Sequence, residues 1–136
     1  MNQELGLLVV SGNLEHRRAL SAIFKELPVR VSKASTIGQA WKLLLARSTD
    51  LILCEENLAD GSYKDFLKAV RSERRATRFE VLLESDKWDD YLDAIHLGVS
   101  EVIRCPFESR DIEMALVRAA HEVWLRREEQ RLAAST

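Results

Sequence analysis

The sequence predicts an α/β fold in which a five-stranded parallel sheet is covered by helices on both faces. Short apolar segments alternate with amphipathic segments five times along the chain. Strict alternation of strand and helix is typical of a parallel sheet. Several of the apolar segments are almost free of polar residues, as expected of strands buried on both sides.

The expected strands are the apolar segments, and a turn or capping residue separates each from the helix that follows. They are LGLLVV (5–10), VRVSKA (29–34), DLILC (50–54), FEVLLE (79–84) and SEVIRC (100–105). The first and third are the most apolar and are expected at the centre of the sheet. Pro106 ends the fifth strand.

The expected helices are the segments whose hydrophobic residues recur at helical spacing. They cover residues 14–27, 37–48, 63–73, 89–98 and 109–132. Asn13 is a suitable N-cap for the first helix, and Ser35 or Thr36 for the second. Pro28 ends the first helix, and Gly98 ends the fourth.

Length and composition indicate one globular domain. The 136 residues are enough for a hydrophobic core, and 46% of them are hydrophobic and 31% charged. We expect the domain over residues 1–125, with residues 126–136 as an exposed extension of the last helix.

The net charge of −2 gives no support for nucleic-acid binding. The apolar runs are too short to cross a membrane, and no signal peptide is recognised, so we expect a cytoplasmic protein with two reduced cysteines.

Polar residues follow the strands at the sheet edge where doubly wound proteins bind ligands. In such sheets, sites form beyond the carboxyl ends of the strands. The residues there are Ser11–Gly12, Glu55–Glu56, Glu84–Ser85 and Cys105–Pro106.

Residues 5–125 resemble the response-regulator receiver domain of two-component signalling. LLVVSGN resembles the strand that precedes the family's acidic pair, DLILCEENLADGS its phospho-acceptor strand and loop, and GVSEVIRCPF its Gly-Ala…Lys-Pro-Phe ending. The resemblance implies a flavodoxin-like, doubly wound sheet with strand order 2-1-3-4-5.

The resemblance also implies that every diagnostic position has changed. The magnesium-binding acidic pair falls on Ser11 and Gly12, the phospho-acceptor aspartate on Glu55, and the hydroxyl residue on Glu84. The lysine falls on Cys105 and the switch aromatic on Val102. Phosphoryl transfer depends on positioning and on charge neutralisation by metal and lysine, so we expect no aspartyl-phosphate chemistry and no catalytic residue.

Glu55 has two interpretations. It is either a solvated carboxylate at a strand end or a fixed charge that imitates a phosphorylated state. If Glu84 faces the same site, the two carboxylates repel, and either one pKa rises or a cation such as Lys87 compensates.

A repurposed metal site made of Glu55, Glu56 and Glu84 is a weaker hypothesis, and we expect no metal and no cofactor. The three histidines are scattered and form no cluster with the cysteines, so zinc is unsupported. His16 is expected to be solvated on the first helix.

The two cysteines are expected to be structural rather than redox-active. Cys54 and Glu55 are neighbours on one strand and should face opposite sides of it. Cys54 is then a small core residue, whereas Cys105 borders Glu55, and no disulfide between the two cysteines is expected.

Aromatic residues of the last two helices suggest a protein-interaction surface. Trp88 and Tyr91 open the fourth helix, and Val117, His121 and Trp124 form a second stripe beside the core stripe of the last helix. The alternative is that Trp124 covers the edge of the domain. Receivers commonly associate through the fourth helix, fifth strand and fifth helix, so this face is the expected interface.

The leading hypothesis is a non-catalytic receiver-like module that binds a sensor kinase or an output protein, or that forms a homodimer. One alternative is a working phosphoacceptor that uses Glu55. Another is a receiver fragment of a larger regulator. Neither nucleic acid nor membrane is expected as a partner.

Overall fold

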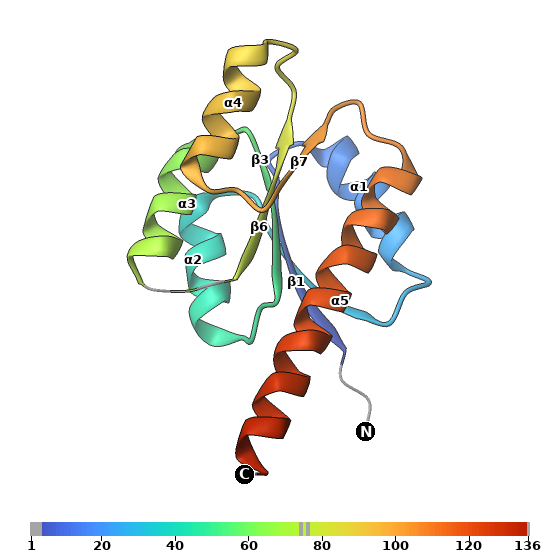
Figure 1. The fold of residues 1–136 in the computed structure, drawn as a ribbon. Helices are drawn as coiled ribbons and strands as arrows, with labels where there is room; N and C mark the ends of the chain where they lie inside the picture. Colours follow the sequence, from blue (N-terminus) through green and yellow to red (C-terminus); the bar gives the residue numbers. More distant parts are fainter. Residues whose placement is uncertain (1–3, 74, 76, 136) are drawn as a thin grey trace.

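A five-stranded parallel sheet forms the centre of the molecule, in the order β2-β1-β3-β6-β7 (Figure 1). The computed structural model describes residues 4–73, 75 and 77–135. The strands are β1 (Leu5–Val10), β2 (Val29–Ala34), β3 (Leu51–Glu55), β6 (Arg78–Leu83) and β7 (Glu101–Arg104). The fold class and the strand order are therefore as predicted, with two extra short strands, β4 (Asn57–Leu58) and β5 (Gly61–Ser62), outside this sheet.

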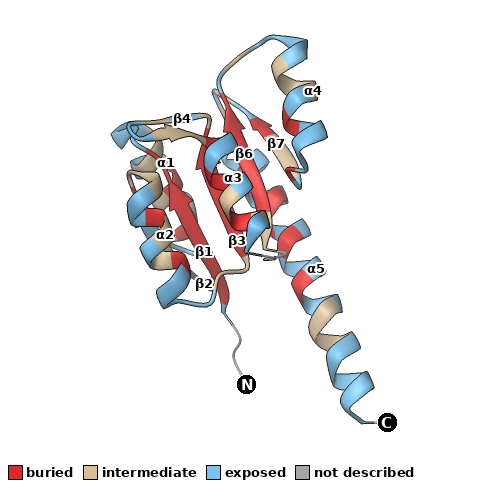
Figure 2. Ribbon diagram, turned by 90° about the vertical axis from the view of Figure 1, so that its left-hand side faces the viewer, coloured by how far each residue is buried: buried red, intermediate tan, exposed pale blue. Residues whose placement is uncertain are grey.

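Five helices cover the sheet on both faces (Figures 1 and 2). They are α1 (Leu14–Phe24), α2 (Ile37–Ala46), α3 (Tyr63–Ser72), α4 (Trp88–Leu97) and α5 (Ser109–Ala134). Alternate residues of each strand enter two separate cores. Leu8 and Val10 pack with residues of α2, α3 and α4, whereas Leu7 and Val9 pack with residues of α1 and α5.

The helix ends agree with the local sequence signals. Asn13 Oδ1 accepts a hydrogen bond from His16 N at 3.0 Å, and Thr36, rather than Ser35, caps α2 by accepting from Gln39 N. Gly98 ends α4 in the left-handed conformation, with φ of 93°. The first helix ends at Phe24, three residues earlier than predicted, and Leu27 N then donates to Phe24 O. Pro28 disfavours helical geometry at Leu27, so the helix could not have continued through that residue.

A small hairpin that the sequence pattern does not predict follows β3. Its strands are β4 (Asn57–Leu58) and β5 (Gly61–Ser62), which pair antiparallel. Its turn residue Asp60 accepts hydrogen bonds from Ile37 N at 2.8 Å and from Gly38 N at 3.0 Å. The hairpin therefore connects the loop after β3 to the start of α2.

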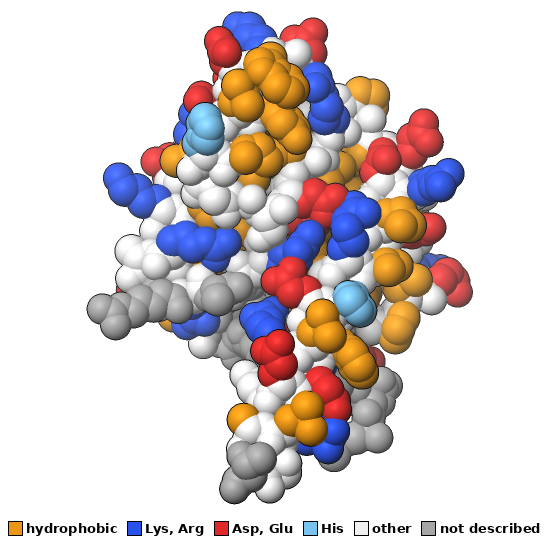
Figure 3. Space-filling model, in the orientation of Figure 1, with side chains coloured by type: hydrophobic (Ala, Val, Ile, Leu, Met, Phe, Trp, Pro, Cys, Tyr) orange, Lys and Arg blue, Asp and Glu red, His pale blue; other side chains and the backbone are white. Residues whose placement is uncertain are grey.

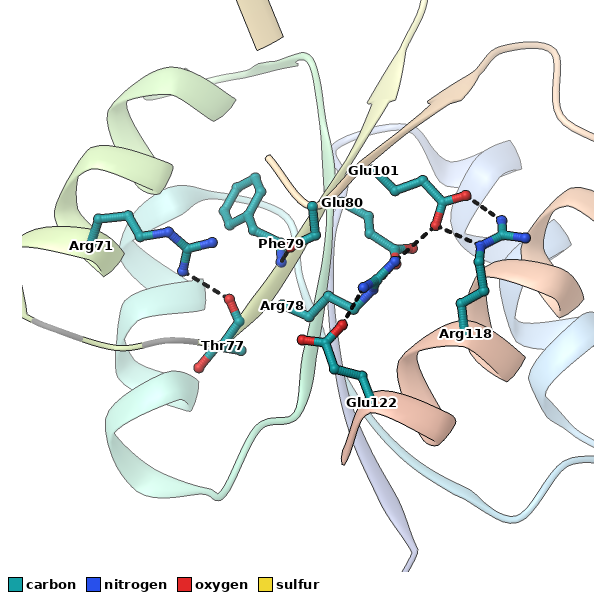
Figure 4. Close-up of polar contacts among 9 residues, drawn as sticks. Arg71, Thr77, Arg78, Phe79, Glu80, Glu101, Arg118 and Glu122 are labelled. Carbon is teal, nitrogen blue, oxygen red and sulfur yellow. Dashed lines mark hydrogen bonds and ion pairs between the residues drawn. The ribbon is translucent and has the colours of Figure 1, made fainter. Parts of the chain in front are cut away.

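A charged network joins the amino ends of β6 and β7 to α5 (Figure 4). Arg78 Nε donates to Glu80 Oε2 at 2.7 Å, and Arg78 Nη2 donates to Glu101 Oε2 at 3.1 Å. From α5, Arg118 Nε also donates to Glu101 Oε2 at 3.1 Å, and Glu122 accepts from Arg78. These contacts fix α5 over the sheet.

Val123 is the last buried residue of α5, and the helix then projects away from the domain (Figure 2).

Candidate functional site

Ser11, Glu55 and Cys105 come together at the carboxyl ends of β1, β3 and β7. Ser11 is fully buried and Glu55 is 4% exposed, while Cys105 is half-buried. Gly12 is exposed beside them and contributes no side chain. Parallel strands end at the same sheet edge, which is why residues 44 and 50 positions apart meet here.

Glu55 is a buried carboxylate with two neighbours that point at the same oxygen. Ser11 Oγ donates to Glu55 Oε1 at 3.0 Å. His16 Nδ1 contacts the same oxygen, and its ring N–H donates to the carboxylate. Because Glu55 is buried, the interpretation of it as a solvated strand-end carboxylate is wrong.

His16 is a part of this site, contrary to the expectation that it is solvated. It lies in the first turn of α1, and its side chain is 20% exposed. Its ring packs edge-on against Phe107 with 5.4 Å between ring centroids. The first turn of a helix that follows a strand lies at the carboxyl edge of the sheet, so the sequence did hold a signal for this placement.

Glu84 faces His16 from the other side, at the edge of the site. Its Oε1 is 4.0 Å from His16 Nδ1, and its side chain is 58% exposed. The sequence suggested that Lys87 could compensate the charges of Glu55 and Glu84. In the structure, the residue that contacts both carboxylates is His16. Lys87 instead donates its backbone N–H to Ser85 Oγ at 3.1 Å.

Glu56 has a structural role that sequence reasoning missed. Its Oε1 accepts hydrogen bonds from Glu84 N at 3.0 Å and from Ser85 N at 3.2 Å. This carboxylate therefore positions the loop between β6 and α4. The Ser85 hydroxyl next to Glu84 donates to Asp90 of α4.

The two cysteines lie on opposite faces of the sheet, as predicted. Cys54 is fully buried in the core under α2, α3 and α4, whereas Cys105 packs against the core under α1 and α5. Both are free thiols. Burial, together with the negative charges of Glu55, Glu84 and Glu56, raises the pKa of Cys105 to about 12, and burial raises that of Cys54.

The residues with metal-ligand chemistry that converge are not the three glutamates proposed from the sequence. Within residues 4–73, 75 and 77–135, the group of such residues that comes together is His16, Glu55 and Cys105. One ligand atom from each lies within 4.8 Å of the other two. The expectation that no histidine clusters with a cysteine is therefore wrong.

The residues proposed for an interface are mostly exposed and lie on two helices, α4 and α5, and Figure 3 shows hydrophobic side chains over each of these helices. On α4, Trp88 is 65% exposed and stacks on Tyr91 with 5.2 Å between ring centroids. On α5, Val117 and Trp124 are 59% and 58% exposed, and Trp124 stacks on His121. Charged side chains lie between the two hydrophobic regions in Figure 3.

An apolar groove of about 1080 Å³ runs beside the α5 region. Val117, His121 and Trp124 line it together with Leu27 and Pro28, which follow α1. Val102, at the switch-aromatic position, is half-buried on β7 and packs against the core on the α4 side of the sheet.

Comparison with solved structures places the chain in the receiver-domain fold. The signal receiver domain of an HD domain-containing protein from Pseudomonas fluorescens superposes with a TM-score of 0.81 at 20% identity, over 88% of this chain and 97% of that one. A Francisella response regulator 1452 receiver domain gives a TM-score of 0.83 at 15% identity, over 88% and 99% of the two chains. A CheY-like receiver domain protein from Methanospirillum hungatei gives 0.80 at 16%, over 88% and 96%.

No family model matches the chain, and no match is found among curated proteins. Within the described part of the chain, no helix is both long and apolar enough to span a bilayer. The structural likeness therefore identifies the architecture: a CheY-like, flavodoxin-type sheet with five helices.

Proposed function

We propose that the chain is a receiver-type signalling module that works through protein contacts and not through aspartyl-phosphate chemistry. The observation that carries this proposal is the set of neighbours of Glu55. The buried carboxylate contacts Ser11 and His16, and the side chain near it from the end of β7 is the thiol of Cys105.

Phosphoryl transfer needs groups that this set does not supply. Magnesium is usually held by carboxylates in near-octahedral geometry, and Ser11 and Gly12 contribute none. The developing charge also needs a fixed cation. A thiol with a pKa of about 12 is neutral at physiological pH and cannot replace a lysine ammonium.

A phosphodonor assay tests the proposal. The full chain is incubated with acetyl phosphate and Mg²⁺ and examined by intact mass, beside a receiver domain that has the acidic pair, the aspartate and the lysine. We expect a phosphoryl adduct on the control alone. An adduct on this chain that disappears in Glu55→Ala would favour the alternative of a working phosphoacceptor.

The interaction surface is proposed on α4, β7 and α5, with the exposed aromatic residues as contacts. The partner is a sensor kinase, an output protein or a second copy of the chain, and the setting is cytoplasmic. Trp88 and Trp124 are exposed, and Trp124 lines the apolar groove between α5 and the segment that follows α1. These features favour a protein partner over nucleic acid, because aromatic side chains supply large contact areas that charge does not.

Affinity capture from the native cell and light scattering of the purified chain test this surface. We expect Trp124→Ala to lose a captured partner or to shift a dimer to monomer. Leu45→Ala is the matched control, because Leu45 on α2 has the same 58% exposure as Trp124. Equal behaviour of the two variants would remove the α5 region from the proposal.

A further inference from the structure

His16, Glu55 and Cys105 combine an imidazole, a carboxylate and a thiol at one point of the sheet edge. One ligand atom from each lies within 4.8 Å of the other two. Imidazole nitrogen, carboxylate oxygen and thiolate sulfur are the ligand types that zinc takes in proteins, and three protein ligands with a fourth position open is the arrangement of catalytic zinc sites. We propose that these three residues form a binding site for Zn²⁺.

The geometry needs only small movements of side chains. Zinc bonds to nitrogen, oxygen and sulfur of about 2.0–2.3 Å place tetrahedral ligands about 3.5 Å apart. The ligand atoms of this group would therefore move toward one another by up to about 1.3 Å, and the hydrogen bond between His16 and Glu55 would be replaced by bonds to the metal.

The backbone at each ligand is held in place. Glu55 is the last residue of β3, paired with Leu82 of β6. Cys105 N donates to Leu83 O at 2.9 Å, which extends the β6–β7 pairing to the ligand itself. His16 N donates a hydrogen bond to Oδ1 of the N-cap residue Asn13 at 3.0 Å. The three ligands thus come from rigid parts of the fold.

Neighbouring residues orient two of the ligands, as outer partners do in metal sites. Ser11 Oγ donates to Glu55 Oε1 at 3.0 Å. Phe107 packs against the His16 ring. Glu84 Oε1 lies 4.0 Å from His16 Nδ1 on the exposed side, next to the group of three ligands but outside it.

The charges around the site also favour a cation. Three carboxylates, those of Glu55, Glu84 and Glu56, lie close enough to Cys105 to act on it electrostatically, and their negative charge attracts a dication. Zinc binds the thiolate form of cysteine, and the thiol proton is released to solvent on binding. Zn²⁺ with one thiolate, one carboxylate and a neutral imidazole is formally neutral, which suits a half-buried position.

The ligand types distinguish this site from a magnesium site. Magnesium prefers oxygen ligands, whereas imidazole and thiolate favour zinc. His16 and Cys105 are the residues that make the difference. This inference goes beyond the proposed function, since a module that works through protein contacts needs no metal.

Metal titration of the chelator-treated full chain tests the site. We expect about one Zn²⁺ per chain by calorimetry, and with Co²⁺ a thiolate-to-metal charge-transfer band in the near ultraviolet. His16→Gln and Cys105→Ser should each weaken Zn²⁺ binding at least about 10-fold. His96→Gln is the matched control and should bind Zn²⁺ as the unaltered chain does, because His96 is exposed on α4.

Alkylation of the unaltered chain gives a second readout that needs no variant. Zn²⁺ should slow the reaction of Cys105 with iodoacetamide, whereas Cys54 is fully buried and should stay unreactive with or without metal. Absence of binding heat and of the Co²⁺ band would overturn the site. So would Zn²⁺ affinity retained in Cys105→Ser, or a Cys105 labelling rate that Zn²⁺ does not change.

Discussion

At the residue scale, Glu55 and Glu80 show two ways of holding a buried carboxylate. Glu55 accepts from Ser11 and His16. Glu80 is fully buried, and while its Oε2 accepts from Arg78 at 2.7 Å, its Oε1 has no hydrogen-bond partner in the structure. A buried carboxylate oxygen without a partner is costly. The negative charge of Glu80 therefore destabilises the folded state.

Stability should fall as pH rises through the titration of Glu80. Burial raises the pKa of Glu80 from 4.5 to about 7, although Arg78 opposes the shift. A folded-state pKa above the unfolded one means that the folded chain binds more protons between these values, so deprotonation favours unfolding there. Compared with Glu80→Gln, the unaltered chain should lose unfolding free energy between pH 4.5 and 7, and the difference should then level off.

Urea unfolding at a series of pH values measures this difference. Glu122→Gln is the control, because Glu122 contacts the same arginine but is 46% exposed. A difference between Glu80→Gln and the unaltered chain that stays constant across this range would contradict the assignment of the raised pKa to Glu80.

At the element scale, local signals predicted most helix ends, but they did not predict contacts between elements. Asn13 caps the start of α1 and Gly98 ends α4, each through contacts with residues close to it in the sequence. Both were predicted from the sequence. Asp60 caps α2 from 23 residues away. No sequence motif relates Asp60 to the start of α2, because the contact between them depends on the hairpin that β4 and β5 form.

Asp60→Asn should destabilise α2 at neutral pH. Hydrogen bonds from Ile37 N and Gly38 N lower the pKa of Asp60 below its ordinary value of 3.8. A lowered folded-state pKa gives stability that is present above 3.8 and is lost as pH falls through the folded value. The variant should therefore be less stable at pH 7, and the difference should shrink in acid.

Thermal unfolding at neutral and acidic pH checks this expectation. Asp86→Asn is the matched control, the same substitution at an exposed aspartate in the loop between β6 and α4. If Asp60→Asn and Asp86→Asn are equally stable at neutral pH, the charge and the second acceptor oxygen of Asp60 contribute nothing to the stability of the fold.

At the scale of the whole molecule, the periodicity of hydrophobic residues predicted the sheet. Five buried strands alternating with amphipathic helices permit few arrangements, and the observed order is one of them. The same pattern predicted that Ser11, Glu55 and Cys105 meet, because parallel strands share an edge. It did not assign His16, whose place depends on how the first turn of α1 lies over that edge.

Removing residues 126–136 should leave the domain folded. The last buried residue of α5 is Val123, and the described ion pair that joins the removed segment to the sheet is Arg127–Asp50, at 3.7 Å. Exposed ion pairs contribute about 0–1 kcal/mol. Asp50 also keeps its hydrogen bond from Gly6 N at 2.8 Å after truncation, so the loss of unfolding free energy should stay within about 1 kcal/mol.

Leu116→Ala in the full-length chain provides the contrast within the same helix. Leu116 is 5% exposed in the core under α5, and truncation of a buried leucine typically costs about 2–5 kcal/mol. Urea unfolding of both proteins measures the two losses. If the truncated chain loses as much as Leu116→Ala, the end of α5 belongs to the domain. A loss near that of one exposed ion pair would make the domain end near residue 125, and the projecting helix would then be free to carry contacts of its own.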